Sequence, residues 1–165
     1  MRRILALCLG GVFLLGGCPS QDYPAVNEVL TVGNYTGIVN CTSTGTGKED
    51  QPSTPEMTVQ VAEKGQLYVW GAPYFEGLEL DMSNASVGVT GSVTINSVAN
   101  DAATKTLTAV GAGTLSSNTT PYATTHNVTL VQSTDTQLQV TWILAGTSTP
   151  PGMEFAITCG GTLSR

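Results

Sequence analysis

The sequence predicts an all-β fold: a single antiparallel meander of eight or nine strands, closed as an up-and-down β-barrel or a flattened barrel. Three observations support this prediction. Beyond residue 30, apolar and polar residues alternate with a period of two, as they do in half-buried strands. Glycine, asparagine, aspartate and proline punctuate these segments. The connections are mostly short, which favours pairing of consecutive strands as hairpins.

The expected strands follow one another with few long interruptions. A loop is expected over residues 42–55, and a bulge or break near Gly91. Gly111 and Gly113 indicate close packing or a bend within a strand. Together with other small residues such as Gly37, they are compatible with either tight curvature or an empty interior. Nine segments carry the alternation: 35–42, 57–62, 66–70, 78–82, 87–98, 104–115, 125–132, 138–144 and 153–159.

Two cysteines bear on how the sheet closes. Cys41 lies in the first expected strand and Cys159 in the last, each on the apolar face. We expect them to form a disulfide, which would contribute about 4–5 kcal/mol for a loop of roughly 100 residues; two buried free thiols are the alternative. Such a bridge would join the terminal strands, as closure of a barrel requires. A β-sandwich with adjacent terminal strands would also allow it.

Residues 1–17 have the order of a cleaved export signal. Arg2 and Arg3 precede an apolar run over 4–15, which is too short to span a membrane. The tetrapeptide Leu15-Gly16-Gly17-Cys18 resembles the lipobox of bacterial lipoproteins. The resemblance implies cleavage before Cys18, a diacylglyceryl group on its sulfur, and an N-acyl chain such as palmitate. It also implies a place in the bacterial cell envelope.

The rest of the chain divides into a lipidated tether over 18–29 and an all-β domain over 30–165. Pro19 follows the cysteine. In enterobacterial lipoproteins an aspartate at that position retains the protein at the inner membrane, so the resemblance implies the outer membrane. Without residues 1–17, four basic side chains remain against twelve acidic ones, a net charge of −8. This balance disfavours nucleic acid as a partner and leaves membrane attachment to the acyl chains.

No catalytic or metal-binding motif is present. His126 is the one histidine, and no HExxH, paired-cysteine or Gly-x-Ser-x-Gly pattern occurs. We therefore expect a protein that is not an enzyme, with no catalytic residue, no metal and no cofactor beyond the lipid on Cys18. His126 is expected at a strand end, and the carboxylates Glu76, Glu79 and Asp81 on a solvated outer face. A hydrolase is the third option, which His126 and carboxylates converging in a cleft would favour.

The strongest binding signal is aromatic, because four aromatic residues fall within eight positions: Tyr68, Trp70, Tyr74 and Phe75. If Leu67 and its neighbours on the same face point to the core, Tyr68 and Trp70 form an exposed binding platform; in the opposite assignment they fill or cap the barrel.

The segment Gly33-Asn34-Tyr35 resembles the Gly-x-aromatic opening of lipocalin-like barrels, with tyrosine where that family has tryptophan. The expected function is a non-enzymatic binding or structural role in the envelope, toward an unknown envelope protein or ligand. The alternative is a lipocalin-like barrel that binds a small molecule or carbohydrate.

Overall fold

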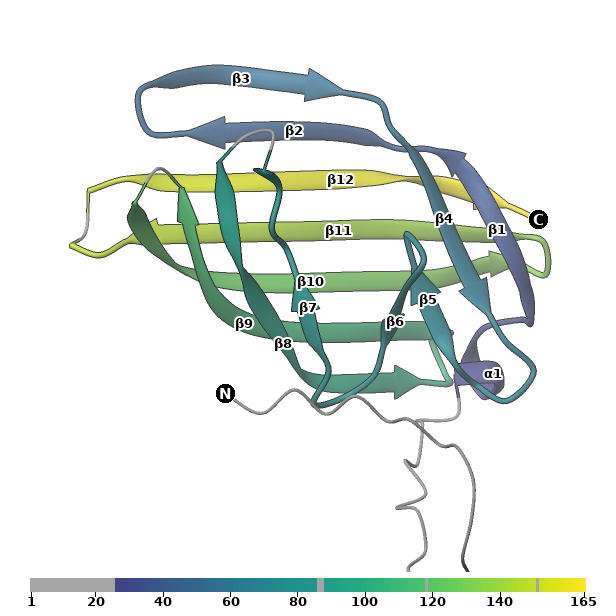
Figure 1. The fold of residues 1–165 in the computed structure, drawn as a ribbon. Coiled ribbons are helices and arrows are strands. Elements are labelled where there is room, and N and C mark those ends of the chain that lie inside the picture. The colour runs from purple at the N-terminus through teal and green to yellow at the C-terminus, as the bar shows by residue number, and fades with distance from the viewer. Residues whose placement is uncertain (1–25, 86–87, 118, 151) are drawn as a thin grey trace, which may run out of the picture.

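The computed structural model describes residues 26–165 except 86–87, 118 and 151. The expected signal peptide, the lipidation site Cys18 and most of the tether lie outside the described residues. The described chain is all-β and forms one antiparallel sheet that is nearly closed into a barrel (Figure 1). Within the described ranges, no helix has the length and apolar character to span a membrane.

In the part of the chain that the structure describes, one short helix precedes twelve strands, which differ widely in length. The last five strands are long, at 11–15 residues each. The elements are α1 (Val26–Val29), β1 (Gly33–Ile38), β2 (Asn40–Gly45), β3 (Lys48–Ser53), β4 (Glu56–Val61), β5 (Leu67–Val69), β6 (Ala72–Tyr74), β7 (Glu79–Asp81), β8 (Val89–Asp101), β9 (Thr106–Ser117), β10 (Thr120–Thr134), β11 (Gln137–Ser148) and β12 (Glu154–Ser164).

The sheet follows chain order around the barrel. Its hydrogen-bonded sequence is β6-β5-β4-β1-β12-β11-β10-β9-β8-β7, with the β2–β3 hairpin attached to β12. The first strand therefore meets the last, as predicted: β1 pairs with β12 at Thr36 and Ser164, and β2 pairs with β12 at Cys41 and Cys159. The expected disulfide joins these two cysteines, whose Cα atoms are 4.0 Å apart. It fastens the terminal strands directly to each other.

The prediction of eight or nine strands is wrong, because three strands were not recognised. The segment 35–42 divides at Val39, whose amide donates to the carbonyl of Pro55 rather than continuing the ladder. Part of the expected loop over 42–55 is β3, which pairs with β2 and is exposed along its whole length. The third is β6, a three-residue strand containing Pro73. Charged, prolyl and very short strands lack the alternation on which sequence analysis depends.

The barrel is not sealed by hydrogen bonds between β6 and β7. These two strands form the ends of the main strand order, and residues 75–78 connect them. The connection is tied to β8, since the amide of Gly77 donates to the carbonyl of Ile95 at 2.7 Å and the amide of Ile95 to the carbonyl of Leu78 at 2.8 Å. Pro73 has no N–H group and suits an edge strand. Closing the first strand on the last thus leaves β6 and β7 as the ends of the main strand order, and β3, which pairs with β2 alone, as a further edge.

Glycines allow the β8–β9 ribbon to coil tightly. A Cβ at Gly113 would lie 2.0 Å from the carbonyl oxygen of Ser92, and one at Gly111 would lie 2.7 Å from that of Thr94. These contacts confirm the close packing expected at both positions. The register shift in β8 falls between Ile95 and Ser97 rather than near Gly91, so the predicted bulge position is wrong.

The core is one cluster of buried side chains contributed by the inner faces of all the long strands. The helix α1 adds Val26 and Val29, and it contacts β8 and β9. The side chain of Asn27 donates to the carbonyl of Glu63 in the β4–β5 turn at 3.1 Å. The helix therefore crosses one end of the barrel. These four residues belong to the packed domain, whereas the sequence had placed them in the tether.

Candidate functional site

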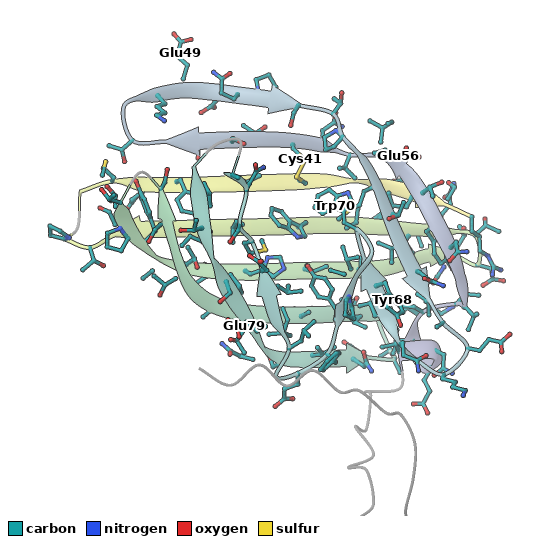
Figure 2. The ribbon with its side chains drawn as sticks, viewed as in Figure 1. Cys41, Glu49, Glu56, Tyr68, Trp70 and Glu79 are labelled. Atoms are coloured by element: carbon teal, nitrogen blue, oxygen red, sulfur yellow. A yellow bond between two sulfur atoms is a disulfide. The ribbon has the colours of Figure 1, made fainter. Side chains whose placement is uncertain are left out.

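The turn between β5 and β6 positions the first aromatic side chain. Trp70 and Gly71 form a two-residue hairpin loop, with φ of 50° and 77° respectively. Positive φ at both positions is the requirement of a type I′ turn. It removes Trp70 from the alternation of β5, so its ring need not follow Tyr68 to the outer face. Figure 2 shows Trp70 beside Glu56, whose carbonyl accepts from the indole Nε1 at 2.9 Å.

Trp70 begins an aromatic array that crosses the barrel. Its ring packs edge-to-face on Trp142 of β11, with centroids 5.5 Å apart. Trp142 in turn packs edge-to-face on His126 of β10 at 5.1 Å. Tyr74 of β6 completes the array, with its ring centroid 5.8 Å from that of His126. The array joins β6 and the β5–β6 turn in one wall to β10 and β11 in the other.

His126 is buried, with 1% of its surface exposed, and both of its ring nitrogens have partners. Nδ1 lies 3.0 Å from the carbonyl oxygen of Ile143, and Nε2 lies 3.0 Å from the hydroxyl of Tyr74. Because a carbonyl can only accept, Nδ1 carries the proton in the neutral ring, and Nε2 accepts from Tyr74. This arrangement corrects the expectation of a polar histidine at a strand end, since His126 lies in the middle of β10.

Burial sets the protonation of both partners. It lowers the pKa of His126, against the smaller effect of the hydrogen bond to Ile143. Burial also raises the pKa of Tyr74 to about 12, opposed by a hydrogen bond involving Trp142. At neutral pH the tyrosine is therefore protonated and able to donate. The pair is a neutral hydrogen-bonded unit.

The four predicted aromatic residues do not form one surface. Leu67 and Val69 point into the core, at 1% exposure each, and Tyr68 lies half-buried on the opposite face of β5. Tyr74 is buried in the array, Trp70 is 39% exposed above it, and Phe75 is half-buried after β6. Each of the two sequence alternatives therefore describes part of the group: Tyr68 faces outward, while Trp70 and Tyr74 cap and fill the interior.

Sequence analysis missed His126 and Trp142 as members of this array, although the signal was present. His126 is in phase with the buried Val128 and Leu130, and Trp142 with the buried Val140 and Leu144. The period of two was therefore enough to place both rings in the interior, against the strand-end position that was expected for His126. The alternation does not show which strands face His126 and Trp142 across the barrel, so it could not predict their contacts with Tyr74 and Trp70.

A second set of polar contacts fills the barrel near α1. The hydroxyl of Tyr35 in β1 donates to the carbonyl of Thr31 at 2.8 Å. The side-chain amide of Gln132 in β10 donates to that hydroxyl at 3.4 Å, and its Oε1 accepts from the Thr31 amide at 2.8 Å. Opposite walls are thus in contact at this level as well.

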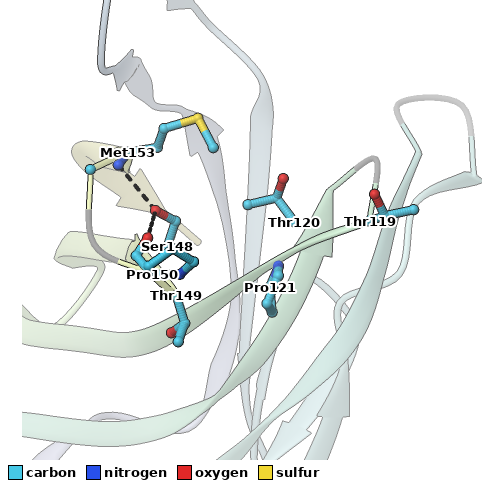
Figure 3. Close-up of a pocket in the computed structure, with 8 residues that line it drawn as sticks. Thr119, Thr120, Pro121, Ser148, Thr149, Pro150 and Met153 are labelled. Carbon is cyan, nitrogen blue, oxygen red and sulfur yellow. Dashed lines mark hydrogen bonds between the residues drawn. The ribbon is translucent and has the colours of Figure 1, made fainter.

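A shallow pocket of about 460 Å³ lies at the rim, where β10 begins and the β11–β12 connection passes (Figure 3). Its buried hydroxyl, on Ser148, is committed within the loop: it donates to the carbonyl of Pro150 at 2.8 Å and accepts from the amide of Met153 at 3.0 Å. Threonine hydroxyls and the Met153 side chain, which is 44% exposed, remain available to a ligand.

The carboxylates lie on the outside of the barrel. Every acidic side chain in the described part of the chain is exposed, including the predicted cluster of Glu76, Glu79 and Asp81. Glu79 accepts from the hydroxyl of Ser92 at 2.5 Å, and Asp81 accepts from the amide of Ser83 at 2.9 Å. Hydrogen bonds from the side chain of Ser83 and from this amide hold the pKa of Asp81 below its usual value. Across the described ranges, no three histidine, cysteine or acidic side chains gather closely enough to hold a metal ion.

The fold and the aromatic array define an all-β, nearly closed barrel whose walls are joined through its interior. No protein-family model, curated protein or solved structure matches this chain.

Proposed function

We propose that this chain is a lipid-anchored bacterial envelope protein with a non-enzymatic role. In this role the barrel binds or supports another envelope component through its outer surface. The anchor rests on the lipobox-like segment ending at Cys18, and the sorting resemblance at Pro19 favours the outer membrane. The disulfide between Cys41 and Cys159 suits an oxidising compartment outside the cytoplasm.

One observation carries the choice between an outer-surface role and a lipocalin-like carrier: side chains join opposite walls at two levels. Near α1 the contact is Tyr35 with Gln132, and near the β5–β6 turn it is Tyr74 with His126. A carrier needs an interior that a ligand can enter, usually of several hundred Å³. Here the interior position is taken by aromatic and amide side chains with their own partners. The remaining recognition surface is the outside of the barrel.

The same observation bears on catalysis. The interior histidine is neutral, has 1% exposure, and uses both nitrogens for Ile143 and Tyr74. A general base must reach the proton that it removes from a substrate. The exposed carboxylates do not supply a partner for it. These features favour a binding or structural role over a hydrolase.

The anchor is tested by metabolic labelling of cells with radioactive palmitate. Wild-type protein should incorporate label and stay with membranes until detergent is added, while Cys18→Ala should accumulate as an uncleaved, unlabelled precursor. Label in the Cys18→Ala protein, or wild-type protein that leaves the membrane without detergent, would refute the anchor.

The surface role is tested separately, by titration with an apolar fluorescent probe such as N-phenyl-1-naphthylamine. We expect no saturable binding and no change in the fluorescence of Trp142. Cross-linking in intact cells before detergent extraction should capture an envelope component. Saturable 1:1 probe binding that Trp142→Ala abolishes, without loss of folding, would support the carrier instead.

A second candidate is binding of a small uncharged ligand in the rim pocket, favoured by its volume and its free threonine hydroxyls. Thr149→Lys should abolish such binding while leaving the core untouched. A screen of neutral sugars and glycols by nuclear magnetic resonance would detect it, and ligand-induced shifts confined to other regions would exclude this pocket.

A further inference from the structure

The outer face of three long strands carries no charge. None of β9, β10 or β11 contains a lysine, arginine, aspartate or glutamate, although these strands are 12, 15 and 12 residues long, respectively. Their single titratable imidazole, His126, points inward and is buried. We call the outward side chains of β9, β10 and β11 the neutral face. It belongs to a chain with a formal net charge of −6.

The register aligns small uncharged side chains in rows across the neutral face. Thr129 of β10 lies opposite Thr108 of β9 and Thr141 of β11. In the next row, Asn127 lies opposite Val110 and Ile143.

These six side chains alternate with buried residues and are half-buried or exposed, with Val110 at 39%. No outward position of these three strands holds an aromatic ring.

Charged residues border the neutral face without entering it. Asp101, Lys105 and Asp135 lie at one end of the strands, beside the β8–β9 and β10–β11 turns, and Glu154 lies at the start of β12 near the other end. In an acidic protein, two copies repel each other wherever their carboxylates approach. The neutral face is where two copies can meet with their charges kept at the edges.

The chemistry of the neutral face also complements itself. A threonine hydroxyl is both donor and acceptor, so a row of threonines can pair with an identical row in either direction. Aromatic rings, which offer flat surfaces for sugars to stack on, are missing from the outward positions described above. This composition favours a second copy over a glycan.

The size of the neutral face fits such an interface. Three strands of about twelve residues cover roughly 14 by 40 Å, or about 600 Å² of sheet. The flanking strands β8 and β12 add to this area. The total then approaches the roughly 800 Å² that each partner buries in a standard interface.

We propose that the neutral face is the surface through which two copies of this chain associate, packed sheet on sheet about a two-fold axis. The same patch then serves both partners. The association does not depend on the lipid anchor. Its strength should lie in the micromolar range, about 1–100 µM, because the face is polar and lacks a central aromatic anchor.

Sedimentation equilibrium of the full-length protein, in a density-matched detergent, tests the proposal. We expect a monomer–dimer equilibrium that tightens as salt is raised, because salt screens repulsion between two acidic copies. Thr129→Lys should weaken dimerisation at least tenfold by placing like charges opposite each other. Thr58→Lys, at an exposed position on β4 outside the neutral face, is the matched control and should dimerise as wild type does.

Circular dichroism establishes that each variant is folded. If Thr129→Lys does not fold, Thr141→Cys provides an independent measurement. A short bis-maleimide should cross-link it into dimers more efficiently than Thr58→Cys or the parent protein. A wild-type monomer up to about 0.1 mM, or equal behaviour of the Thr129 and Thr58 variants, would overturn the proposal. A monomer that instead sediments with purified peptidoglycan, and loses this binding in the Thr129→Lys variant, would assign the face to a glycan and also overturn it.

Discussion

The hydroxyl of Tyr74 and Nε2 of His126 lie 3.0 Å apart, and this hydrogen bond joins β6 to β10 across the interior of the barrel. The two residues are 52 positions apart in the chain. Because β6 is an edge strand of three residues, its own ladder fixes it weakly. The buried bond to β10 therefore contributes to holding the open side of the barrel in place.

Removing the Tyr74 hydroxyl should destabilise the domain. Tyr74→Phe leaves Nε2 of His126 buried without a donor, which costs about 1–3 kcal/mol. Urea denaturation followed by tryptophan fluorescence measures the change. Tyr68→Phe, on the half-exposed outer face of β5, is the control and should stay within about 0.5 kcal/mol of wild type. Equal effects of the two variants would show that the hydrogen bond contributes nothing specific.

Stability should fall as the pH drops below about 6.5, the ordinary histidine pKa. Burial lowers the pKa of His126 in the folded state, so the unfolded chain binds a proton that the native protein does not. The stability contributed by neutral His126 is complete above pH 6.5 and is lost as the pH falls toward the native pKa. The free energy of unfolding should change by at most about 1.4 kcal/mol per pH unit, which is the slope for uptake of one proton on unfolding.

Denaturation curves between pH 8 and pH 5 measure this slope. His126→Asn should flatten it, at the expense of some stability at pH 8. The pKa values of Asp81 and Asp101 are held below their usual range, so these two carboxylates titrate at a lower pH than the range measured here. A wild-type slope that persists in the His126→Asn variant would show that another group is responsible.

Loss of the disulfide should lower the melting temperature under oxidising conditions. Cys41→Ser together with Cys159→Ser removes the covalent link between the first and last strands, worth about 4–5 kcal/mol for a loop of this length. Differential scanning calorimetry with and without dithiothreitol measures the effect. Reductant should lower the wild-type transition to that of the double variant and leave the double variant unchanged. A wild-type melting temperature that does not change with dithiothreitol and equals that of the double variant would contradict the bridge.

A methyl group at Gly113 should be far more disruptive than one at Gly160. At Gly113 the new Cβ would meet the Ser92 carbonyl oxygen at 2.0 Å and the Val93 Cα at 2.7 Å, both of them backbone atoms. Gly113→Ala should therefore cost at least about 3 kcal/mol or prevent folding. At Gly160 the nearest atom is 3.6 Å away, an ordinary contact, so Gly160→Ala should fold normally. Thermal melts of the two variants test this difference. Equal melting temperatures would show that β8 and β9 can move apart to accept a methyl group at Gly113.

Much of the fold could be predicted from local pattern. The alternation identified the five long strands, because each buries one face against a common core, as the buried Val128 and Leu130 do in β10. The position of Cys41 and Cys159 predicted that the terminal strands meet, and the disulfide confirms it. Of the three strands that were not recognised, β3 is fully exposed and β6 is too short to show a period, while β2 was merged with β1 into one segment.

The candidate site was less accessible to sequence analysis. Four neighbouring aromatics indicated a cluster, yet the array that forms uses two of them with His126 and Trp142 from the opposite wall. The inward turn of Trp70 depends on a positive φ, which residue type alone does not predict for tryptophan.

The amino-acid sequence by itself determined the strand periodicity, the acidic balance and the pairing of the terminal strands, because these follow from neighbouring residues and from the placement of two cysteines. The tertiary structure decided that the interior is occupied by cross-barrel contacts and that uncharged side chains align into one face. Both depend on which strands lie opposite or beside one another, and residues as distant as Tyr35 and Gln132 meet only when the sheet curls. Curvature and register are properties of the folded sheet as a whole, so they appear only with its three-dimensional arrangement.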